Sequence, residues 1–124
     1  MSNPADHSAA RSEALGAFDT ARDDFLAAFA AVPDEALSYL PAGDEYALGV
    51  LPMHLCDSMR RYLGAFDRIQ QAGYGPVDLA ADAALAEREA QHHRELVASR
   101  PTGADRPHML DELRATHGQV RRHA

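Results

Sequence analysis

The segment Leu51-Pro-Met-His-Leu-Cys-Asp-Ser-Met-Arg-Arg-Tyr-Leu-Gly-Ala-Phe-Asp-Arg-Ile69 carries the strongest structural signal in this chain. Its apolar residues recur with the spacing of a helix and not with the alternation of a strand: Leu51, Leu55, Met59, Tyr62, Leu63, Phe66 and Ile69. The segment therefore predicts one long amphipathic helix, from about Ala47 or Leu51 to Gln71. Pro52 suits an early position in that helix because its missing N–H group is not needed there.

Another helix is expected before this segment. It runs from roughly Ala9 to Ala31, after a frayed stretch over residues 1–8. Pro33 ends it, because proline lacks a backbone donor and disfavours a helical conformation in the residue before it. A short helical turn over Asp34–Leu40 then leads into a loop at residues 41–44.

Two more helices are expected after the quoted segment. Gly73-Tyr-Gly75-Pro76 ends the segment's helix, and the next one spans about Leu79 to Ser99, with Asp78 as its candidate cap. The last helix begins near Pro107 or His108 and runs to the chain end. Four helices with short loops predict a single all-α domain over residues 1–124, folded as an up-and-down four-helix bundle.

Composition supports the helical class and argues against several functions. The chain has one Ile and no Trp, so strand formers are scarce. A net charge of −7 argues against a nucleic-acid surface, which normally needs a basic face. The lone cysteine, Cys56, has no intrachain disulfide partner, and neither a signal peptide nor a membrane span is evident. We therefore expect a cytoplasmic protein that has neither a nucleic-acid nor a membrane partner.

Seven histidines raise the question of metal binding. His54 lies at the flank of the apolar stripe of the quoted helix. Glu89 and His93 fall one turn apart on the inward stripe of the following helix, and His117 lies on the apolar side of the last helix. These four residues are the candidate metal ligands, because imidazoles with a carboxylate suit zinc or nickel and leave a position open for water or substrate.

The competing interpretation of these histidines is structural. A carboxylate four residues before a histidine often forms a local pair on its own helix, and the short signature His-x-x-x-His is absent. His92 is expected at the surface. The remaining histidines are expected at solvent-facing or terminal positions: His7, His108 and His123.

The other polar residues of the quoted helix are expected to carry no chemistry. Cys56 is interpreted as a small buried thiol, because residues two apart diverge on a helix and this geometry disfavours a His54–Cys56 catalytic pair. Asp57 and the doublet Arg60-Arg61 are expected to face solvent.

The first 70 residues resemble the DinB-like family of four-helix bundles, which are related to thiol-dependent transferases and maleylpyruvate isomerases. The resemblance rests on Phe25-Leu-Ala-Ala-Phe-Ala-Ala-Val-Pro-Asp-Glu-Ala-Leu37 and on Pro41-Ala-Gly-Asp-Glu-Tyr-Ala-Leu-Gly-Val-Leu-Pro-Met-His-Leu55, continuing to Arg61-Tyr62. Tyr46-Ala47 stands where the family has Trp followed by Ser or Thr. His54-Leu55 matches the family's first metal ligand.

The resemblance implies a divalent metal cofactor, zinc or nickel, and a homodimer. It is incomplete at the family's second ligand motif, His-x-x-x-His followed by Gly-Gln. Thr116-His117-Gly-Gln119 matches the end of that motif, but Leu113 occupies the place of its first histidine. Either the metal is lost, or Glu89 and His93 substitute, or Met109–Ala124 is the third-helix segment of a shortened bundle.

Two functions of different class follow. The first is a DinB-like metal-dependent hydrolase or transferase acting on a small molecule, or a degenerate relative of one. In it, a metal at His54, with His117 and with Glu89 or His93, activates a bound water or thiol. The second is a non-catalytic helical module, a dimer or a small-ligand-binding bundle, whose histidines are structural.

Overall fold

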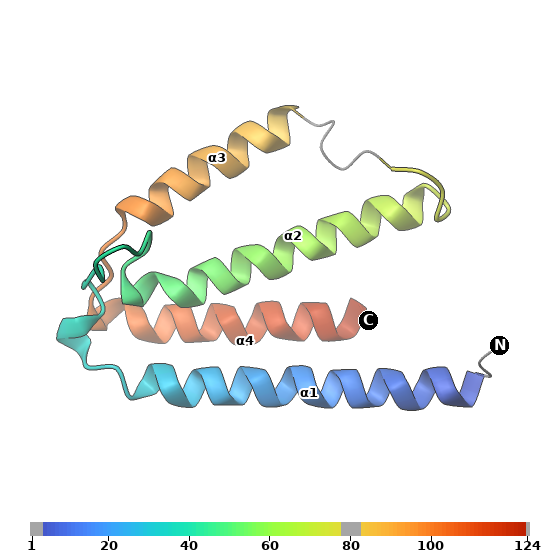
Figure 1. Ribbon diagram of the computed structural model, residues 1–124, viewed down its shortest axis with the longest axis horizontal. Helices are drawn as coiled ribbons and strands as arrows, with labels where there is room; N and C mark the ends of the chain where they lie inside the picture. The colour runs from blue at the N-terminus through green and yellow to red at the C-terminus, as the bar shows by residue number, and fades with distance from the viewer. Residues whose placement is uncertain (1–3, 78–82, 124) are drawn as a thin grey trace. The chain divides into compact units, whose positions relative to one another are not determined.

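The computed structural model describes residues 4–77 and 83–123, and over these ranges the chain is helical, without strands (Figure 1). The all-α prediction is confirmed. Among the described residues, no helix has both the length and the apolar character needed to cross a membrane. The elements in chain order are α1 (Pro4–Ala30), η1 (Asp34–Ala36), η2 (Leu48–Val50), α2 (Leu51–Gln71), α3 (Ala83–Ala98), η3 (Gly103–Asp105) and α4 (Arg106–His123).

The limits of α2 agree with the prediction. It begins at Leu51 with proline in its first turn and ends at Gln71. The backbone then turns through Gly73 and Tyr74, which have φ angles of 61° and 62°, so the chain leaves the helix axis at the predicted terminator. The strain of the left-handed region falls on Tyr74, because a side chain disfavours this conformation.

Two helix starts differ from expectation. Helix α1 begins at Pro4, earlier than the expected start near Ala9, because proline suits the first turn of a helix. Helix α4 begins at Arg106, directly after a capping box in which Thr102 and Asp105 satisfy each other's backbone donors. The expected cap Asp78 and the expected start at Leu79 lie outside the described residues.

The chain divides into two compact units, Met1–Val32 and Pro33–Ala124. The first contains α1, where the rings of Phe25 and Phe29 stack with their centroids 5.8 Å apart. The second contains every other element and all of the cleft described below.

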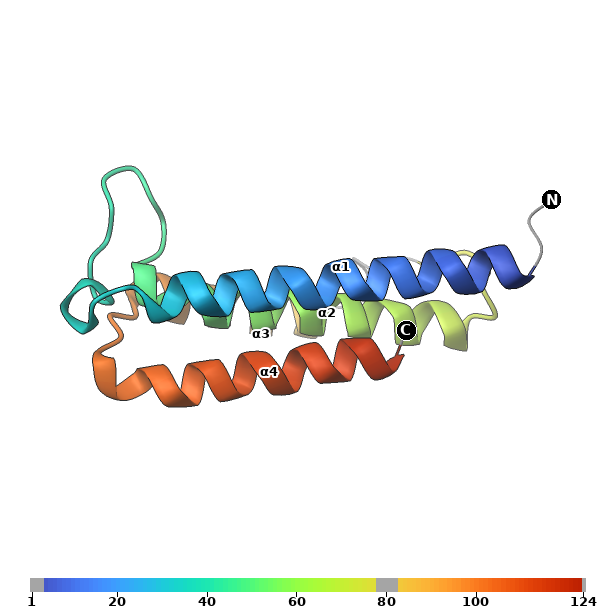
Figure 2. The same cartoon turned by 90° about the horizontal axis from the view of Figure 1, so that it is seen from below.

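In the second unit, α4 lies alongside α2 (Figures 1 and 2). The buried side chains between these helices include Cys56 of α2 and Met109, Leu113 and Thr116 of α4. Helix α3 is anchored near its C-terminal end, where Leu96 joins a buried cluster with Ala47 and Val50. Toward its N-terminal end α3 diverges from α2 (Figure 1). Side chains of both helices line a cleft.

Only part of the apolar stripe of α2 meets these neighbours. Four of its residues are exposed: Leu51, Leu55, Tyr62 and Phe66. Near the C-terminal end of α2, Phe66 and Ile69 line a small cavity with Val120 and His123 of α4. Elsewhere α4 packs on the side of Cys56 and Arg60, and α3 on the side of Asp57 and Arg61. Periodicity predicted the helix correctly, but much of the surface that packs within this unit carries smaller or charged side chains.

Candidate ligand-binding cleft

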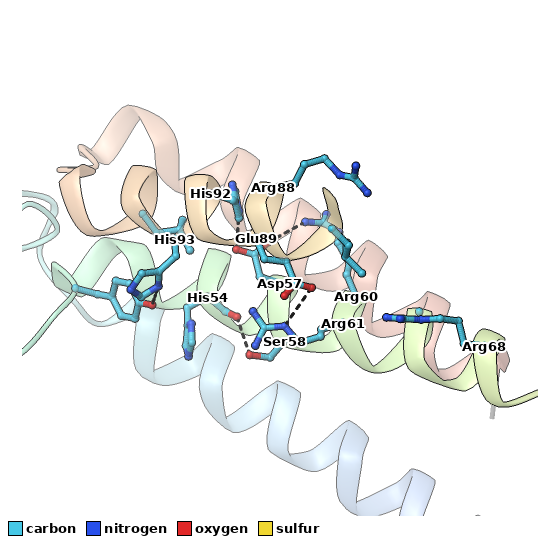
Figure 3. A pocket seen from close by; sticks show the side chains of 14 residues that line it. His54, Asp57, Ser58, Arg60, Arg61, Arg68, Arg88, Glu89, His92 and His93 are labelled. Atoms are coloured by element: carbon cyan, nitrogen blue, oxygen red, sulfur yellow. Dashed lines mark hydrogen bonds and ion pairs between the residues drawn. The ribbon is translucent and has the colours of Figure 1, made fainter. Parts of the chain in front are cut away.

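The cleft between α2 and α3 has a volume of about 490 Å³ and is lined mainly by polar side chains of both helices (Figure 3). Tyr46, from the loop before η2, closes the end at which the two helices meet. The charged residues of the lining are Arg60, Arg61, Arg68, Arg88, Asp57 and Glu89. The cleft therefore has an aromatic end and a wall rich in arginine.

Tyr46 organises the aromatic end. Its ring centroid lies 5.0 Å from that of His54 of α2, with a tilt of 34°. It also lies 5.7 Å from the ring centroid of His93 of α3, in an edge-to-face arrangement. Burial raises the pKa of the Tyr46 hydroxyl, and the nearby carboxylates of Glu45 and Asp57 raise it further, so this hydroxyl stays protonated and available as a donor.

Both ring nitrogens of His93 have partners. Its Nε2 lies 2.6 Å from Oε1 of Glu45, and because a carboxylate only accepts, Nε2 donates this bond. In the neutral ring Nδ1 then accepts from the Tyr46 hydroxyl, at 2.9 Å. These two hydrogen bonds connect α3 to the loop that carries Glu45 and Tyr46.

A second connection joins α3 to α2 and α4. The Nε2 atom of His92 donates to Oδ2 of Asp57 at 2.6 Å. Arg60 lies 3.6 Å from the other oxygen of Asp57 and 3.3 Å from Glu112 of α4. A continuous series of hydrogen bonds and ion pairs therefore connects the three helices of this unit.

The arginine wall is only partly neutralised. Arg61 of α2 reaches Glu89 of α3 with a long separation of 3.8 Å, and its side chain is 66% exposed. Arg88 extends outward from α3 at the rim in Figure 3, and no ion pair joins it to a residue of the described ranges. The lining holds four arginines and two carboxylates, in a chain whose net charge is −7. Because Arg60 is also paired with Glu112 of α4, Arg61 and Arg88 are the two arginines of the lining that carry this positive charge into the cleft.

Three of the four predicted metal ligands line this cleft, namely His54, Glu89 and His93. The fourth, His117, does not line it: it is buried in α4, as is Leu113. Glu89 engages Arg61, and both nitrogens of His93 are engaged as well. Within residues 4–77 and 83–123, no group of three or more His, Cys, Asp or Glu side chains is arranged to hold a metal ion. This arrangement does not fit a metal centre, and the zinc or nickel site stays a prediction.

Sequence reasoning missed several residues of the cleft. Arg60 and Arg61 are exposed, as expected, but they also line the cleft and pair with α4 and α3. Asp57 was expected to face solvent, but its side chain is only 18% exposed. His92 is about half exposed, as expected, yet its ring reaches Asp57. At the aromatic end, His54 and His93 were predicted site residues, whereas Tyr46 was marked only by standing where the DinB-like family has Trp.

Comparisons of the chain with protein-family models, with curated proteins and with solved structures found no match. The DinB-like resemblance therefore stays a prediction from sequence.

Proposed function

We propose that the unit formed by residues 33–124 binds a small organic anion in the cleft between α2 and α3. The observation that carries this proposal is the concentration of arginine there, four against two carboxylates, in a chain of net charge −7. A positively charged cleft in a negatively charged protein attracts anions and raises their local concentration. The volume of about 490 Å³ is suited to a small molecule.

The basic side chains of this protein are of the type that binds anions with defined geometry as well as attracting them. All twelve basic residues of the chain are arginine, and none is lysine. A guanidinium presents paired donors that match the two oxygens of a carboxylate or phosphate. Arg61 is held loosely by Glu89, and Arg88 is held by no described carboxylate, so both can turn toward an anion at little cost.

Binding is a better account of this cleft than catalysis. Ser58 donates its hydroxyl to the backbone oxygen of its own helix at His54, so no base activates it. His92 and His93 are oriented by carboxylates and by Tyr46. Cys56 is buried, and burial raises the pKa of its thiol, which opposes thiolate formation. The Tyr46 hydroxyl does lie beside a base, His93, but its raised pKa opposes ionisation. Among the other described lining residues, no nucleophile is placed beside a base.

The test is titration of the purified chain with pyrophosphate, followed by calorimetry at low and moderate salt. The double variant Arg61→Gln/Arg88→Gln should weaken binding more than tenfold, because each charge-assisted hydrogen bond contributes about 1.5–3 kcal/mol. Arg94→Gln is the matched control, because Arg94 lies on α3 but pairs with Glu87 outside the cleft. Absence of binding by the unaltered chain, or equal binding by the double variant, would refute the proposal.

The metal-dependent, DinB-like hydrolase or transferase is a second candidate. It is favoured by the presence of His54, Glu89 and His93 around one cleft. Metal binding there requires His93 to lose its hydrogen bond with Glu45 or with Tyr46. It also requires Glu89 to lose its ion pair with Arg61. The homodimer implied by the same resemblance belongs with this candidate, and light scattering of the purified chain tests it.

A further inference from the structure

The two ends of the cleft have different chemistry. Tyr46, His54 and His93 place rings at the end where α2 and α3 meet. Arg61, Arg68 and Arg88 lie toward the end where the helices diverge. His54 and Arg61 are seven residues apart on α2, which corresponds to roughly 10 Å along the helix axis. A ligand that uses both ends therefore has to be elongated and to differ along its length.

The ring end suits a planar group with polar edges more than a hydrocarbon. Tyr46 and its two histidine neighbours offer aromatic faces and edges, and Leu96 supplies an apolar surface beside them. Glu45 stands next to these rings with a carboxylate that is about half exposed and accepts hydrogen bonds. Ring N–H and exocyclic amino groups are the donors that satisfy such a carboxylate.

The charges fix the direction in which the ligand lies. Glu45 repels an anion from the aromatic end, whereas Arg61 and Arg88 attract one at the other end, where Glu89 approaches Arg61 only to 3.8 Å. The anionic group therefore belongs beside the arginines, with the ring against Tyr46. A phosphate fits best there, because several guanidinium groups can share its oxygens and its charge exceeds that of one carboxylate.

Building on the anion-binding function proposed above, we propose that the ligand is a nucleoside phosphate. Its base lies against Tyr46, His54 and His93, and its phosphates lie between Arg61 and Arg88. The site takes a free nucleotide and not a nucleic-acid strand, because a chain of net charge −7 repels an extended phosphate backbone.

The test compares ADP, GDP, CDP and UDP with adenosine and with pyrophosphate by calorimetry on the full chain. The best nucleoside diphosphate should bind at least tenfold more tightly than pyrophosphate and than adenosine. Tyr46→Ala should weaken that nucleotide at least tenfold and pyrophosphate less than twofold. Tyr62→Ala is the control for loss of an aromatic ring, because Tyr62 is exposed on α2 outside the cleft.

Tyr46→Phe keeps the ring and removes only the hydroxyl, so it should retain nucleotide binding within threefold even if Tyr46→Ala unfolds. Equal binding of pyrophosphate and of all four nucleotides would overturn the ligand class and leave the anion-binding function standing. Failure of every phosphate compound to bind would overturn both. Tighter binding of a single-stranded oligonucleotide than of the free nucleotides would overturn the assignment to a mononucleotide.

Discussion

The Nε2 atom of His92 lies 2.6 Å from Oδ2 of Asp57, and this hydrogen bond joins α3 to α2 at the middle of the cleft. The carboxylate of Asp57 also lies 3.6 Å from Arg60, which reaches Glu112 of α4. The Asp57 side chain is only 18% exposed, whereas most ion-paired side chains of this protein are far more exposed. One shielded carboxylate therefore binds α3 directly and is connected to α4 through Arg60.

Asp57→Asn should lower the free energy of unfolding by about 1 kcal/mol, because it removes a charge from a partly shielded pair. Asp67→Asn is the matched control: Asp67 is also an α2 aspartate paired with a histidine, His123, at 3.2 Å, but it is 55% exposed. Urea unfolding measures both, and amide hydrogen exchange should show faster exchange in α3 for Asp57→Asn only. Equal effects of the two substitutions would contradict this role for Asp57.

The helices could be predicted from sequence where local chemistry sets their ends. Pro52 and the Gly73 turn fix α2 without help from distant residues, so its limits were correct. Which face of α2 meets a neighbour depends on how α3 and α4 pack, and periodicity reports only that an apolar face exists. The exposed Tyr62 and Phe66 lie on that face.

Some of the residues that line the cleft could also be predicted from sequence. Glu89 and His93 were placed inward because they share a helix face with Leu96, and they do line the cleft. The pair of His92 with Asp57 was not predictable, because no local pattern relates residues 35 positions apart. His117 was rightly expected on the apolar side of its helix, but that side packs in the core and not in the cleft.

Gly49 is a position where any side chain should collide with its neighbours. A Cβ atom there would lie 2.8 Å from the backbone oxygen of Leu37 and 2.9 Å from Cβ of Pro101. Gly49→Ala should therefore lower the free energy of unfolding by about 1–3 kcal/mol, since the backbone must move. Thermal and urea unfolding measure this loss.

The control for Gly49→Ala is Gly16→Ala, in the interior of α1, where an added Cβ meets no atom within 4 Å. This substitution should raise stability by about 0.5–1 kcal/mol, because alanine restricts the unfolded chain and favours helix. The close approach at Gly49 would be refuted if both alanine variants were at least as stable as the unaltered chain.

Cys56 should make stability depend on pH in the alkaline range. Burial raises the pKa of its thiol above the ordinary value, and the hydrogen bond from Thr116 offsets only part of that effect. The folded chain therefore keeps the thiol protonated at a pH where the unfolded chain ionises it. The stabilisation is fully present below the unfolded pKa, about 8.5, and is lost as pH rises through the folded pKa.

The measurement is urea unfolding between pH 7.5 and pH 10 for the unaltered chain and for Cys56→Ala. The unaltered chain should lose up to about 1.4 kcal/mol per pH unit above the unfolded pKa relative to the variant. The absence of lysine removes the main competing titration from this range, and the raised pKa of Tyr46 has the same sign at higher pH. Parallel stability curves for the two proteins would contradict the assignment.

Zinc titration distinguishes the two candidate functions of the cleft. Binding a metal at His54 and His93 requires His93 to release Glu45 or Tyr46, and His117 lies too deep in the core to complete the set. We therefore expect no stoichiometric zinc or nickel binding by calorimetry, and no change in Tm with EDTA.

His108→Ala, which removes an exposed histidine outside the α2–α3 cleft, controls for weak surface binding. One equivalent of zinc that is retained in His108→Ala and lost in His54→Ala would establish the metal centre. In that case Glu89 and His93 reorient around the ion, and the metal-dependent function replaces anion binding as the role of the cleft.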